Sequence, residues 1–73
     1  MNPTIGQSVE FTLIPGGKIE QRRTIVGLNE DGSLHCTRTI LSTGIVIDEP
    51  KLLLSFWQRL CEREGSKIYE ENC

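Results

Sequence analysis

Residues 7–28 read QSVEFTLIPGGKIEQRRTIVGL and decide how the chain folds. Polar and apolar side chains alternate over residues 7–14, with frequent β-branched and aromatic types, which indicates a strand with one buried face. The following Pro15-Gly16-Gly17 contains two residues that accept positive φ without steric cost. The stretch therefore predicts two antiparallel strands, at about 7–14 and 18–28, joined by a short hairpin loop.

The register of this first hairpin follows from the length of its loop. A loop of three residues places Phe11 opposite Gln21 and Glu10 opposite Arg22. The second pair sets an acid against a base across the two strands, which favours this register over its neighbours.

In the first hairpin the odd-numbered residues at the start of the second strand face the core, whereas the second hairpin requires its even-numbered residues to do so. Turn residues at 29–32 close it so that Val26 faces Cys36. The second strand must then change parity once, and we predict a β-bulge between Arg23 and Ile25. A long, bent second strand shared between two halves of a curled sheet is typical of small barrels.

The remainder of the chain predicts two more strands and one helix. The strands are expected at about 33–41 and 44–48, and the helix at about 50–64 with Gly65 behind it. Asp48 or Glu49 is expected to cap this helix and Pro50 to lie in its first turn, where a missing N–H costs nothing. A short closing strand at 67–69 is optional.

Residues 1–73 are therefore predicted to form one mostly β (α+β) domain, an antiparallel meander of four or five strands with one amphipathic helix near the C-terminus. This element order resembles that of SH3-like and Sm-like small barrels. The resemblance is one of architecture and implies no function.

Composition places the chain among small folded proteins. Seventy-three residues leave room for one core, and the apolar and charged shares of 37% and 25% are those of globular chains. The chain has no secretory signal pattern and no apolar run long enough for a bilayer. Its three cysteines are odd in number and widely spaced, so we expect reduced thiols in a soluble, cytoplasmic protein.

The predicted helix carries the main functional hypothesis. Its apolar side chains sweep roughly 200° of the helical wheel, wider than the stripe that one sheet covers. Part of this face is expected to stay exposed and to bind another protein or a second copy. We predict a non-catalytic interaction or regulatory module, an accessory protein that forms a homodimer through Leu53, Leu54, Trp57 and Cys61.

A nucleic-acid interface is the alternative. Four basic residues could gather on one face of a curled sheet and hold the backbone of RNA or single-stranded DNA, namely Lys18, Arg22, Arg23 and Arg38. The net charge of −2 and the shortage of free aromatic side chains make a nucleic-acid interface the less favoured hypothesis.

Metal binding and catalysis are not expected. His35, Cys36, Cys61 and Cys73 are potential zinc ligands, but they lack the paired, short spacings of a structural site. Neighbouring strand residues such as His35 and Cys36 also point to opposite faces. A barrel of this size fills its interior with side chains, so we predict no cofactor, no metal and no enzymatic activity.

Overall fold

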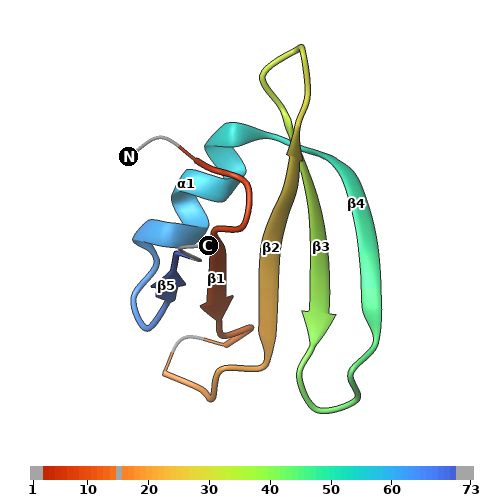
Figure 1. Ribbon diagram of the computed structural model, residues 1–73. Helices are drawn as coiled ribbons and strands as arrows, with labels where there is room; N and C mark the ends of the chain where they lie inside the picture. Colours follow the sequence, from red (N-terminus) through yellow and green to blue (C-terminus); the bar gives the residue numbers. More distant parts are fainter. Residues whose placement is uncertain (1–2, 15, 71–73) are drawn as a thin grey trace.

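The computed structural model describes residues 3–14 and 16–70, and within them one sheet and one helix (Figure 1). The sheet is antiparallel with the order β4-β3-β2-β1-β5. The predicted mostly β fold with one helix near the C-terminus is confirmed. The elements are β1 (Ser8–Phe11), β2 (Gln21–Leu28), β3 (Leu34–Ile40), β4 (Val46–Leu52), α1 (Leu54–Glu62) and β5 (Lys67–Tyr69).

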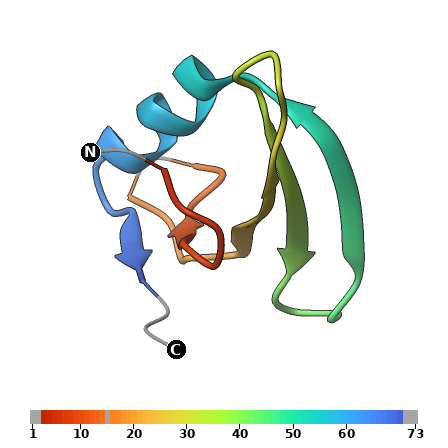
Figure 2. The same ribbon diagram turned by 45° about the horizontal axis from the view of Figure 1, so that its top comes forward.

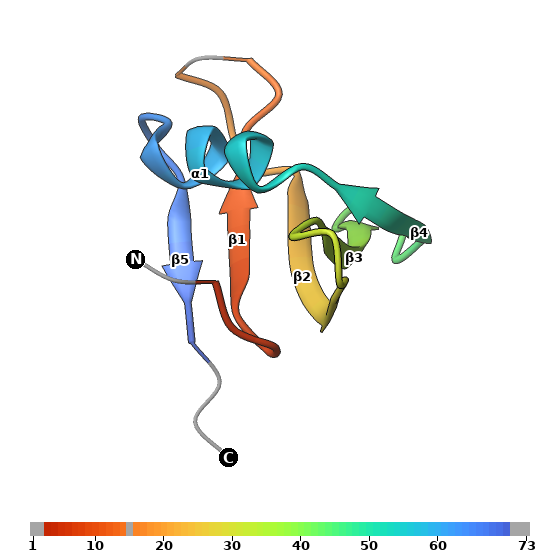
Figure 3. The same cartoon turned by 90° about the horizontal axis from the view of Figure 1, so that it is seen from above.

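The sheet is strongly twisted but not closed. Seen from above, β1 and β5 show their full length whereas β3 is viewed nearly end-on (Figure 3). Because β4 and β5 are the two edges, no strand pair joins them into a barrel. The helix α1 lies across β1 and β5 on one side of the sheet (Figures 1 and 3), and we call this side the inner face.

The first hairpin has the predicted register. Phe11 lies opposite Gln21 and Glu10 opposite Arg22. The strand β1 is shorter than the predicted 7–14, since it ends at Phe11. Leu13 and Ile14 consequently lie in the connection to β2, where both are exposed.

The bulge in β2 lies later than predicted. The register shifts between Ile25 and Gly27, so Ile25 and not Val26 pairs with Cys36. Val26 is the extra residue and is 44% exposed. Gly27 accounts for this position, because a strand departs from regular geometry most easily beside a residue that lacks a side chain.

The fourth strand replaces the predicted start of the helix. β4 runs to Leu52 and contains Pro50, which an edge strand tolerates. The helix begins only at Leu54, with Leu53 as its N-cap and no capping hydrogen bond from a side chain. The predicted caps at Asp48 or Glu49 and the predicted place of Pro50 are therefore wrong.

The two predicted glycine positions and the optional closing strand are confirmed. The turn before β4 contains Gly44 with φ of +77°, and Gly65 follows α1 with φ of +86°. The optional closing strand is present as β5, paired with β1.

The core lies between α1 and the upper part of the inner face, toward the β2–β3 turn. Trp57 and Leu60 are the buried residues of α1. They pack with apolar side chains from four strands, namely Val9, Phe11, Ile25, Leu34, Cys36 and Leu52. A helix of nine residues covers only part of the sheet, which leaves the lower inner face without a cover.

Phe11 is the aromatic strand residue of this core, and its removal tests the fold. Phe11→Ala is expected to lower the free energy of unfolding by about 3–5 kcal/mol, since it empties a buried aromatic site. Urea denaturation followed by Trp57 fluorescence measures this loss. A loss below about 1 kcal/mol would show that Phe11 is not packed as described.

Candidate functional site

The predicted interface residues of α1 have different environments. Leu53 is 66% exposed, whereas Leu54 and Cys61 are partly buried against the core. Trp57 is only 3% exposed, so the prediction that it belongs to an exposed face is wrong. The later start of the helix explains this difference, because a shorter helix has a narrower apolar stripe that the sheet can cover.

The four basic residues of the nucleic-acid hypothesis do not form one surface. Arg22 lies on the outer face, where its Nε donates to Glu10 Oε2 at 3.0 Å. This hydrogen bond is the main cause that lowers the pKa of Glu10. Lys18 lies in the connection between β1 and β2. Only Arg23 and Arg38 are brought together, as opposite residues of β2 and β3.

Arg23 and Arg38 belong to a polar band across the middle of the inner face. The side chain of Arg23 is 7% exposed and pairs with Glu49 through Nε to Oε1 at 2.7 Å and Nη2 to Oε2 at 3.1 Å. Arg38 approaches the same carboxylate at 3.5 Å and donates to Gln21 Oε1 at 3.2 Å. Glu49 thus neutralises part of the charge of two guanidinium groups.

The guanidinium of Arg23 also lies against two aromatic rings. The ring centroids of Phe11 and Phe56 are 5.5 Å and 5.7 Å from its Cζ. This geometry is that of cation–π contacts. Arg23 therefore connects β1, β4 and α1 from its place on β2.

Below the polar band, the inner face ends in an apolar hollow of about 520 Å³, which we call the end hollow. Leu13 and Leu41 are exposed there, and Ile19 and Ile40 are half-buried. Polar residues complete its lining, namely Lys18, Glu20, Gln21 and Ser42. This hollow could not be predicted from a first strand that extends to Ile14, because Leu13 would then belong to the strand.

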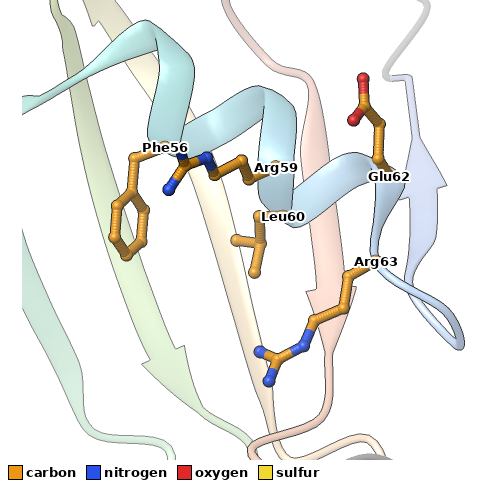
Figure 4. Close-up of a pocket in the computed structure, with 5 residues that line it drawn as sticks. All are labelled: Phe56, Arg59, Leu60, Glu62 and Arg63. Atoms are coloured by element: carbon orange, nitrogen blue, oxygen red, sulfur yellow. The ribbon is translucent and has the colours of Figure 1, made fainter.

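A second hollow lies along α1, and we call it the helix hollow (Figure 4). Its volume is about 350 Å³, and its lining consists of Phe56, Arg59, Leu60, Glu62 and Arg63. Phe56 is 53% exposed. The figure shows Phe56, Leu60 and Arg63 on the same side of the helix, with the carboxylate of Glu62 turned away.

A third hollow, of about 320 Å³, lies on the other side of α1 next to β5. Trp57 and Cys61 form part of its wall together with Ile68. These two predicted interface residues are thus neighbours in space. They line a recess between elements of the chain, in contrast to the exposed face that the sequence predicted.

The candidate metal ligands do not converge. His35 Nε2 lies 2.6 Å from Asp48 Oδ1, and both side chains are on the outer face. Cys36 is buried on the inner face. Cys73 lies outside the described residues. Within residues 3–14 and 16–70, no group of three or more His, Cys, Asp or Glu side chains could hold a metal ion.

No protein-family model, no curated protein and no solved structure matches this chain. The functional argument therefore rests on the surfaces described above. In the described part of the chain, α1 is the only helix, and it is neither long nor apolar enough to cross a membrane.

Burial raises the pKa of the Cys36 thiol to about 11. The charge of Arg23 lowers this pKa slightly, and the charge of Glu49 raises it slightly. At pH 8 its thiolate fraction should be roughly 100-fold below that of an ordinary thiol, because the ordinary pKa is two units lower. We expect iodoacetamide to modify Cys36 at least this much more slowly in the folded than in the urea-unfolded protein.

The measurement uses a Cys61→Ser, Cys73→Ser variant, in which Cys36 is the only thiol. Mass spectrometry follows the reaction at several times. Equal rates in the folded and unfolded protein would contradict the burial of this side chain.

Proposed function

We propose that this protein is a non-catalytic interaction module that associates with a second copy of itself through the end hollow. The observation that carries the proposal is an imbalance of apolar surface. Among the described residues, twelve large hydrophobic side chains are exposed and eight hydrophobic residues form the buried core. Single exposed apolar residues are ordinary, but clustered ones mark interaction surfaces.

Four of these twelve exposed residues lie together at the lower end of the sheet. The β1–β2 and β3–β4 connections both lie there (Figure 1). They contain Leu13, Ile14, Leu41 and Ile45, of which Ile14 is 70% exposed. Leu13 and Leu41 line the hollow, and Ile14 and Ile45 lie in the same two connections.

A second copy is the partner that this patch suits best. A two-fold contact needs one surface that complements itself. The lower end of the sheet offers both a recess and protruding apolar side chains. Lys18 and Glu20 line the same recess, so a two-fold axis through it can set Lys18 of one copy against Glu20 of the other.

Other surfaces are less suited to association. The edge strand β4 contains Pro50 and the charged Asp48 and Lys51, which discourage pairing with a further strand. The exposed residues of α1 include the polar Ser55, Gln58 and Arg59. The original hypothesis of a dimer through the helix is therefore replaced by one through the end hollow.

The non-catalytic part of the proposal is supported by the placement of the reactive groups. His35 and Asp48 lie on the outer face and line none of the three hollows. Cys36 is buried, and burial also raises the pKa of the Cys61 thiol. Cys36 and Cys61 are free thiols, which fits the proposed cytoplasmic location.

Light scattering coupled to size-exclusion chromatography tests the association. Over a range of micromolar concentrations, the wild-type mass is expected to rise from 8.2 kDa toward about twice that value. A Leu13→Glu, Ile45→Glu variant should stay at the monomer mass, because it buries two carboxylates in the proposed contact.

The matched control is Ile5→Glu, Leu53→Glu, which changes two exposed residues that do not line the end hollow. It should associate as the wild type does. The proposal fails if the wild type stays monomeric at every concentration. If only the control variant lost association, the result would support the hypothesis of a dimer through the helix and Leu53.

A further inference from the structure

The helix hollow has a composition that self-association does not explain. Phe56, Arg59, Leu60 and Arg63 follow the spacing i, i+3, i+4, i+7, so their side chains share one stripe of the helix and its C-terminal extension. The hollow of about 350 Å³ lies within the range of small-ligand sites, about 300–1,000 Å³. It is thus large enough for one planar group and its substituents.

The charge of this stripe is not neutralised within the described residues. Arg22, Arg23, Arg38 and Lys51 each have a carboxylate within 4 Å, whereas Arg59 and Arg63 have none in that part of the chain.

Glu62 also lines the hollow, but its carboxylate points away from both arginines (Figure 4). Arg59 lies in the last turn of α1 and Arg63 is its C-cap, and two like charges this close repel each other. An anion bound between Arg59 and Arg63 would remove this repulsion.

The exposed ring of Phe56 offers a flat surface beside these charges. Its contact with the guanidinium of Arg23 is 5.7 Å from Cζ to the ring centroid. Arg23 is in turn fixed by the two hydrogen bonds to Glu49. The ring is therefore supported from the sheet while half of the side chain remains open to solvent.

We propose that the helix hollow binds a nucleotide, with the base stacked on Phe56 and the phosphate held by Arg59 and Arg63. Stacking on an aromatic ring together with arginine contacts to phosphate is how proteins hold unpaired nucleotides. Leu60 supplies the apolar floor between the two contacts. An acidic peptide would satisfy the arginines but leave the ring uncovered, so the planar ligand is the better match.

The site differs from the four basic residues that the sequence analysis selected. Those residues are divided between the outer face, the polar band and a loop, and three of them are paired with carboxylates. The nucleotide can be free or part of a single strand, because both present the same base and phosphate. The proposal does not depend on self-association.

Fluorescence anisotropy with labelled dT10 and rU10, between 50 and 200 mM salt, tests the site. The protein is the Leu13→Glu, Ile45→Glu variant, so that association does not interfere. Binding is expected to weaken with salt, and Arg59→Gln, Arg63→Gln should raise Kd at least about tenfold. It should also reduce the log–log salt slope by about 1.4, the value for two contacts to a single strand.

Two further variants separate charge from stacking. Lys51→Gln, Lys67→Gln removes the same charge elsewhere and should leave Kd within about twofold, which excludes a general charge effect. Phe56→Leu should raise Kd about tenfold with an unchanged salt slope, as expected for loss of stacking. Trp57 fluorescence and thermal melts confirm that each variant is folded.

Competition identifies the source of the nucleotide. Displacement of the labelled strand by UMP or AMP assigns the site to free nucleotides, and displacement by unlabelled strand alone assigns it to single strands. The proposal is overturned if no probe binds at 50 mM salt, or if Kd is unchanged in Arg59→Gln, Arg63→Gln. Equal competition by a ten-residue glutamate peptide, with Phe56→Leu binding normally, would replace it with an acidic-peptide site.

Discussion

The ion pair between Arg23 and Glu49 is the interaction on which the rest of the structure depends. The strands β2 and β4 are not neighbours, so the Glu49 side chain must cross over β3 to reach Arg23. Only a curled sheet brings the two groups together on its inner face. Because the Arg23 guanidinium also contacts the rings of Phe11 and Phe56, the same group fixes the edge strand and the helix to the centre of the sheet. The Arg23 side chain is only 7% exposed, so breaking the pair is costly because it leaves a guanidinium that solvent hardly reaches.

This polar band divides the inner face into two parts with different roles. Mostly above it, α1 and the strands enclose the core that contains Trp57, and Phe11 extends this core to the level of Gln21. Below it lies the open, apolar end hollow, which we propose binds a second copy of the chain. The helix hollow lies beside the band and takes its aromatic platform from the residue that Arg23 supports. The ion pair thus supports the ring of the proposed nucleotide site, whereas it reaches the end hollow only through Arg38 and Gln21.

Local sequence patterns predicted the number and order of the strands but not all of their bounds, nor the contacts between distant segments. The register at Phe11 and the turns at Gly44 and Gly65 follow from residues close in the chain, and all three were predicted. The role of Glu49 was not, because a carboxylate before a proline also fits a helix cap. Extending the helix to Pro50 then widened its apolar stripe and led to the wrong exposure of Trp57. Of the candidate interface, only Leu53 was placed correctly at the surface. The helix hollow was not among the predicted sites, because no interpretation of the sequence involved Arg59 or Arg63.

A double-mutant cycle on Arg23 and Glu49 tests the central claim most directly. The free energy of unfolding is measured by denaturant titration for Arg23→Met, Glu49→Gln and the double variant. The account predicts a coupling of at least about 2 kcal/mol, as expected for a desolvated pair. The same cycle on Arg22 and Glu10, an arginine–glutamate pair on the outer face, should give less than about 1 kcal/mol. A coupling for Arg23 and Glu49 no larger than that of the outer pair would contradict the account.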